Sequence, residues 1–151
     1  MNHEAREIYQ KTILTHNKAP KNFRAIKEST HYAEGHNPLC GDSLELYIIL
    51  DERGIIKDIS FLGKACAITT SATSMMTEAL KNKSETEARD LIELFQQLIT
   101  GKITPDEARE NLGDLAIFSG IRDYPSRIKC ASLSWHTVKA ALNKEELATT
   151  E

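Results

Sequence analysis

The sequence lacks the features that stabilise small secreted proteins. Its 151 residues include only three cysteines, and no two of them are spaced as Cys-x-x-Cys. An odd number of dispersed cysteines does not make a disulfide framework, and a reducing compartment is the default for such a chain. Residues 1–7 contain no basic stretch followed by an apolar one, so they do not form a signal peptide. We therefore expect a cytoplasmic protein.

Long apolar runs and a surplus of one charge are also absent. The longest uninterrupted apolar run, Leu46 to Leu50, has five residues, whereas a membrane-spanning helix needs about 20. With 19 Lys+Arg against 22 Asp+Glu, the formal net charge of -3 does not favour binding to a nucleic-acid backbone. We expect neither a membrane nor a nucleic acid as a partner.

The remaining composition is that of an ordinary globular protein. Hydrophobic residues make up 40% of the chain and charged residues 27%, which leaves no reason to expect disorder. The length suits one domain with a substantial core and is too short for two domains of usual size. We predict a single domain over residues 1–151, in which residues 143–151 form a flexible polar tail.

Helical spacing of apolar residues recurs through most of the chain. The expected helices are residues 3–17 with Asn2 as N-cap, residues 67–81, a segment from the capping box Ser84-x-x-Glu87 to Gly101, a segment from Thr104 to Gly113, and a last helix that begins at or just after Cys130. The stretch between Leu112 and Pro125 is too mixed to assign.

Strand alternation is confined to one region. Apolar residues alternate from Leu44 to Leu50, a turn follows at residues 51–54, and a second alternation runs from Ile55 to Phe61. This pattern predicts a β-hairpin. The polar segment from Pro20 to Asp42 is expected to be a long irregular loop. The fold class is therefore α+β, with a small antiparallel β-sheet packed against several α-helices.

The cysteines are candidates for metal binding, although free cysteine is also a common inert core residue. Cys40 lies in the turn-rich segment, and Cys66 and Cys130 lie at the expected beginnings of helices. Free backbone N–H groups and the helix dipole stabilise a thiolate there. Three thiolates and one carboxylate suit tetrahedral zinc. Asp42 follows Cys40 closely, so the expected ligands are Cys40, Asp42, Cys66 and Cys130.

Such a site needs compensating positive charge. Three thiolates, a carboxylate and Zn²⁺ add up to a formal charge of about -2, which a half-buried site cannot leave unbalanced. Basic residues flank two of the cysteines: Lys64 precedes Cys66, and Arg127 and Lys129 precede Cys130. We expect these three to support the site, the alternative being an ordinary solvated surface.

Three motifs together resemble one known family. The segments Asn37–Asp42, Cys66–Glu78 and Ser126–His136 resemble the IscU/NifU N-terminal family of iron–sulfur assembly proteins, and the resemblance covers nearly the whole chain. Within this family the chain looks like the SufU branch. Lys129 stands where the classical scaffold branch has a histidine before its third cysteine, and the run between the second and third cysteines is longer here.

The SufU resemblance implies a zinc-dependent sulfurtransferase. Cys40 would be the mobile zinc ligand and would accept persulfide sulfur from a pyridoxal-phosphate-dependent, SufS-like cysteine desulfurase. Gly41 would be its hinge, and the sulfur would pass to downstream iron–sulfur scaffold proteins. Two alternatives stay open. The same four ligands suit a [2Fe–2S] assembly scaffold, and they also suit a purely structural zinc domain.

Overall fold

The computed structural model describes residues 3–150, so the expected N-cap Asn2 lies outside the described residues. The helices are α1 (His3–Lys18), α2 (Ala67–Leu80), α3 (Glu85–Ile99), α4 (Pro105–Leu112), the 3₁₀ helix η1 (Gly113–Ile121) and α5 (Pro125–Leu142). The strands are β1 (His31–Asn37), β2 (Asp42–Leu50), β3 (Ile56–Lys64) and β4 (Leu147–Thr149). The predicted α+β class is confirmed. No helix within residues 3–150 has the length and hydropathy to cross a membrane.

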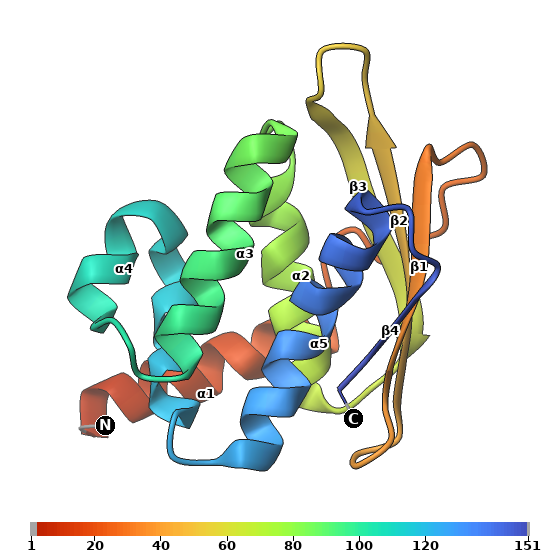
Figure 1. Cartoon of the computed structure of the whole chain (residues 1–151). Coiled ribbons are helices and arrows are strands. Elements are labelled where there is room, and N and C mark those ends of the chain that lie inside the picture. The colour runs from red at the N-terminus through yellow and green to blue at the C-terminus, as the bar shows by residue number, and fades with distance from the viewer. Residues whose placement is uncertain (1–2, 151) are drawn as a thin grey trace.

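The strands form one four-stranded sheet in the order β3-β2-β1-β4. The pairs β1–β2 and β2–β3 are antiparallel, and β4 joins β1 in parallel at the edge. The predicted hairpin is therefore confirmed as β2–β3, with Leu46 opposite Phe61. The helices gather on one face of the sheet, as Figure 1 shows. The apolar side chains of the strands pack against this helical layer.

Helix α5 is at the centre of the helical layer. It packs against α2, α3 and strand β1. The buried rings of Phe95 on α3 and Trp135 on α5 stack with their centroids 4.4 Å apart and an interplanar angle of 11°. The predicted capping box of α3 is present, since Ser84 and Glu87 bond each other's backbone N–H groups. Regular apolar spacing therefore predicted this part of the fold correctly.

The expected long loop between Pro20 and Asp42 is wrong for its second half, which forms β1. The inward-facing residues of β1 are Ala33, Gly35 and Asn37, and all three are buried. None of them is a large apolar residue, so no hydrophobic alternation marks this strand in the sequence. Gly35 has no room for a side chain, because a Cβ at this position would clash with the hydroxyl of Thr137 on α5.

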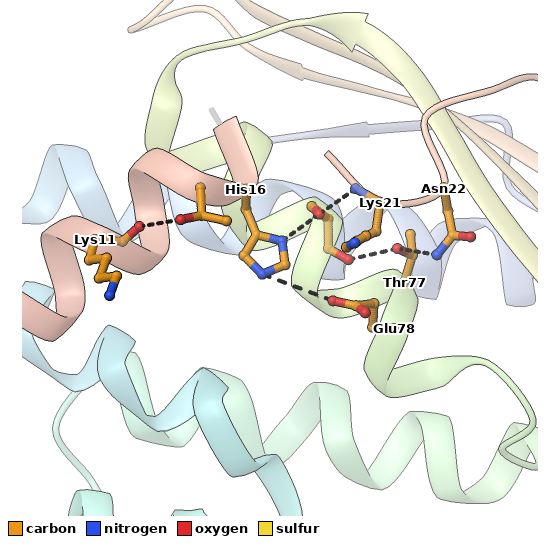
Figure 2. Close-up of polar contacts among 8 residues, drawn as sticks. Lys11, His16, Lys21, Asn22, Thr77 and Glu78 are labelled. Atoms are coloured by element: carbon orange, nitrogen blue, oxygen red, sulfur yellow. Dashed lines mark hydrogen bonds and ion pairs between the residues drawn. The ribbon is translucent and has the colours of Figure 1, made fainter. Parts of the chain in front are cut away.

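The segment between α1 and β1 is irregular, as expected, but it is attached to α2 by polar contacts (Figure 2). Ser74 Oγ lies 2.7 Å from His16 Nδ1 and accepts a hydrogen bond from the Lys21 N–H at 2.8 Å. The Asn22 amide donates to Thr77 Oγ1 at 3.0 Å. These contacts give the polar groups of α2 partners and fix the path of the chain towards the sheet.

Two expectations for the C-terminal part are corrected. Helix α5 begins at Pro125 rather than at Cys130, and proline occupies its first turn, where the missing N–H is no loss. The segment 143–151 was expected to be a fraying tail, but its residues Leu147–Thr149 form β4 and pair with β1. Cys130 consequently lies inside a helix, and the chain returns to the sheet after α5.

The close packing of β1 on α5 can be tested with a double-mutant cycle. Gly35→Ala should lower the free energy of unfolding by about 1–3 kcal/mol, because the new methyl group meets the Thr137 hydroxyl. Gly35→Ala combined with Thr137→Ala should recover the part of this loss that the clash causes. Urea denaturation of the four proteins gives the coupling energy. Additive effects of the two substitutions would contradict this packing.

Candidate metal centre

The four predicted ligand residues meet at one end of the molecule. The turn between β1 and β2, the beginning of α2 and the first turns of α5 lie together there (Figure 1). Cys40 lies in this turn, Asp42 opens β2, Cys66 is the N-cap of α2, and Cys130 lies within α5. Residues from distant parts of the sequence therefore form one cluster.

The spacing of the donor atoms fits a tetrahedral metal site. The donor atoms of Cys40, Asp42 and Cys130 all lie within 4.8 Å of one another. Cys130 Sγ is 3.3 Å from Cys40 Sγ, and Cys66 Sγ is 3.9 Å from Asp42 Oδ2. An ideal tetrahedral zinc site places two sulfur ligands about 3.8 Å apart and a sulfur and an oxygen about 3.5 Å apart. The donor atoms of Cys40, Asp42 and Cys130 therefore fit zinc in both chemistry and spacing, whereas Cys66 Sγ lies close to Asp42 but outside this mutually close set.

Asp42 is the most firmly held residue of the cluster. Its side chain is buried, with the residue only 2% exposed. Asp42 Oδ1 accepts a hydrogen bond from the Cys66 N–H at 2.8 Å, and Oδ2 accepts from Thr69 Oγ1 at 2.7 Å and from the Asn37 amide at 3.0 Å. A buried carboxyl group needs such donors, because its oxygens have lost their contacts with water. These contacts also turn Oδ2 towards the thiols.

Cys66 ionises more easily than Cys130. A hydrogen bond with Cys130, assisted by the hydroxyl and the backbone N–H of Thr69, lowers the pKa of Cys66 to about 6 against the opposing effect of burial. The Thr69 N–H donates to Cys66 Sγ at 3.5 Å, as an N-capping contact does. The expected link between a helix start and a thiolate thus agrees with the environment of Cys66.

Cys130 and Cys40 have different environments. Cys130 is 3% exposed, and its hydrogen bond with Cys66, followed by burial, raises the pKa of its thiol. Because α5 begins at Pro125, the expected position of Cys130 at the beginning of a helix is wrong. A position at a helix beginning would lower the pKa of the thiol, whereas the pKa of Cys130 is raised. Cys40 is exposed on a turn. The next residue, Gly41, has a φ of +70°, which favours glycine.

The three basic residues expected to support the site lie on the surface. Lys64, Arg127 and Lys129 are all exposed, and the Arg127 guanidinium lies 4.6 Å from the centroid of the Tyr124 ring. Within residues 3–150, Asp42 accepts hydrogen bonds from neutral donors instead, namely the Asn37 amide, the Thr69 hydroxyl and the Cys66 N–H. A supporting role for the three basic residues stays a prediction.

Asn37 and Thr69 are the site residues that sequence reasoning missed. Thr69 stands three residues after Cys66, the spacing of a capping pair, so a local signal for it was available. Asn37 offered no comparable signal beyond its turn-forming character. Its amide contacts Cys130 Sγ at 3.6 Å, and that neighbour comes from a distant part of the chain.

Three thiols and a buried carboxylate lie together at one end of an α+β fold. This arrangement places the protein among candidates for metal binding through thiolates. The sequence model described as "NifU-like N terminal domain" matches residues 8–143, and the chain belongs to this family. The predicted family is confirmed.

Relatives with curated names carry two different functions. The chain is 35% identical over 139 residues to the zinc-dependent sulfurtransferase SufU of Bacillus subtilis, covering 92% of each chain. It is 34% identical over 137 residues to the iron-sulfur cluster assembly scaffold protein IscU of Streptococcus pyogenes serotype M1, covering 91% of this chain and 84% of that relative.

Among solved structures, the chain resembles the putative iron-sulfur cluster assembly scaffold protein for the SUF system from Fervidobacterium islandicum AW-1. The TM-score is 0.82 at 32% identity, over 90% of this chain and 97% of that one. This likeness supports the same family and the same α+β fold.

The unequal thiols lead to a prediction for the metal-free protein. Because the pKa of Cys66 is lowered to about 6, its thiolate fraction rises as the pH rises through this value. The raised pKa of Cys130 keeps that thiol protonated at neutral pH. Alkylation by iodoacetamide, followed by peptide mass spectrometry between pH 5 and 8, should show Cys66 reacting with a midpoint near its pKa and Cys130 staying unmodified.

Thr69→Val is the matched control for this experiment. It removes the hydroxyl that lies 3.3 Å from Cys66 Sγ while keeping the size of the side chain. The midpoint for Cys66 should then move to higher pH, because the Thr69 hydroxyl lowers the pKa of Cys66 and its loss also leaves the Asp42 carboxylate with one donor fewer. Faster alkylation of Cys130 than of Cys66 at neutral pH would contradict the prediction.

Proposed function

We propose that the protein is a zinc-dependent sulfurtransferase. It accepts persulfide sulfur on Cys40 from a pyridoxal-phosphate-dependent, SufS-like cysteine desulfurase and relays it to iron–sulfur cluster assembly. The observation that supports this most is the difference in exposure among the clustered thiols. Cys40 is exposed on its turn, whereas Cys66 is half-buried and Cys130 is buried. The name of the Bacillus subtilis relative agrees with this function.

The residues that would hold zinc are Cys40, Asp42, Cys66 and Cys130. Bound zinc would supply the positive charge that keeps all of the thiols deprotonated at neutral pH. Cys130 gains most from this, because its surroundings raise its pKa in the metal-free protein. Cys66 requires less help, since its pKa is already lowered to about 6.

The transfer step is a thiol–persulfide exchange. The Cys40 thiolate attacks the terminal sulfur of the desulfurase persulfide, and a new S–S bond forms at Cys40 Sγ. The S–S bond of the donor breaks, and the donor cysteine leaves as a thiolate. No net oxidation or reduction takes place. The exposed turn suits this encounter, and the backbone freedom of Gly41 lets Cys40 swing outwards.

A [2Fe–2S] assembly scaffold is the second candidate function. The scaffold name of the Streptococcus pyogenes relative favours it, and thiolate sites serve both iron–sulfur clusters and zinc. Lys129 favours the sulfurtransferase instead. A lysine ammonium has no lone pair for a metal, whereas a histidine at this position could coordinate one. The position of Lys129 directly before Cys130 therefore bears on the choice of function.

The metal content separates the two functions. Protein purified without added iron should be colourless and should contain about one zinc per chain, because the four proposed ligands would complete one tetrahedral site. Elemental analysis and the visible spectrum check this directly. Removal of zinc with a chelator should lower the melting temperature, since structural zinc contributes on the order of 10 kcal/mol to folding. Brown protein with visible absorbance would favour the scaffold.

Cys40→Ala tests the sulfur-accepting role. In a desulfurase assay with a thiol reductant, this variant should reduce alanine formation to the rate of the desulfurase alone, because no acceptor thiol remains. Mass spectrometry should show one added sulfur atom on Cys40 of the wild type and none on the variant. Ser43→Ala is a control, because Ser43 is exposed next to Asp42 and is outside the ligand set. If the desulfurase forms alanine as fast with Cys40→Ala as with the wild type, a structural zinc domain would be favoured.

A further inference from the structure

Asn37 links the candidate metal centre to the C-terminal segment. It is completely buried, and its amide donates to Asp42 Oδ2 at 3.0 Å and to Cys130 Sγ at 3.6 Å. The Asn37 side-chain oxygen accepts a hydrogen bond from Thr150 Oγ1 at 2.9 Å. One amide therefore contacts two candidate ligands on one side and a residue beyond β4 on the other.

The chemistry of the partners fixes the orientation of this amide. The Asn37 NH₂ group faces Asp42, because it donates a hydrogen bond to Asp42 Oδ2. The oxygen then faces the opposite side, where the Thr150 hydroxyl donates to it. Both amide hydrogens and the amide oxygen thus have partners, which is what a buried polar group requires.

Backbone pairing brings Thr150 to this position. The Thr150 N–H donates to the His36 carbonyl at 3.2 Å, directly after the parallel pairing of β4 with β1. The hydroxyl therefore belongs to the residue that directly follows β4, within the segment that the sequence predicts to be a flexible tail. Removing the hydroxyl alone leaves this backbone pairing in place.

We propose that Thr150 is a positioning residue for the metal centre. Its hydroxyl fixes the Asn37 amide, and the amide holds Asp42 and Cys130 in place and donates a hydrogen bond to the Cys130 sulfur. Such donors withdraw charge from a metal-bound thiolate and orient the ligands. The proposal rests on the proposed function in one respect, since it takes these residues as zinc ligands.

The test compares Thr150→Val with Thr150→Ser. Valine keeps the shape of threonine and removes the hydroxyl, whereas serine keeps the hydroxyl. Zinc affinity is measured by competition with a chromophoric chelator, and Co²⁺ is used as a spectroscopic probe of the ligand geometry. Thr150→Val should weaken zinc binding about two- to tenfold, as the loss of one hydrogen bond predicts. It should also shift the visible Co²⁺ bands, while Thr150→Ser should match the wild type.

Asn37→Ala should have a larger effect, about 10- to 100-fold on zinc affinity, and the Thr150 variants keep the test valid if this variant does not fold. If Thr150→Val binds zinc as tightly as the wild type and has the same Co²⁺ bands, the positioning role of Thr150 is overturned. The proposed function is not affected by that result. Weaker zinc binding with unchanged Co²⁺ bands and a lower melting temperature of the metal-free protein would show a merely structural role and also overturn it. A wild type that binds no metal would overturn the proposed function as well.

Discussion

The buried carboxylate of Asp42 is the constraint on which the site depends. A charge taken out of water must be matched by hydrogen-bond donors, or folding loses several kcal/mol. Asp42 obtains its donors from Asn37 at the end of β1 and from Cys66 and Thr69 at the beginning of α2. Satisfying this one charge therefore also fixes the turn that carries Cys40 relative to Cys66. The second amide hydrogen of Asn37 extends the same network to Cys130 on α5.

The sequence predicted the fold best where local spacing carries the information. Helix α3 and the hairpin β2–β3 have regular apolar periods, and both were predicted correctly. Strand β1 was missed because its buried residues are small or polar. Gly35, for example, is buried because Thr137 of α5 lies over it, and α5 comes much later in the chain. Tertiary contacts of this kind leave no local pattern in the sequence.

The candidate site shows the same division between local and distant information. Residue type and local position identified the thiols and Asp42 as possible ligands, and the structure brings them together. The neighbours that set their chemistry come from other elements. The beginning of α5 at Pro125 places Cys130 inside the helix, and its contact with Cys66 raises the pKa of Cys130. A position at the beginning of a helix, taken alone, predicts a lowered pKa for Cys130 instead.

The arrangement separates the frame of the site from the thiol that would have to move. The hydrogen bonds that Asp42 accepts come from Asn37, Cys66 and Thr69. Cys40 contributes its N–H to the Asn37 carbonyl at 3.3 Å, which is a long and correspondingly weak hydrogen bond. Because these donors belong to other residues, the proposed transfer would cost Cys40 only its contacts with the Asn37 carbonyl and Cys130 Sγ, while the buried carboxylate keeps its partners. A site that gives up one ligand and then recovers it requires this independence.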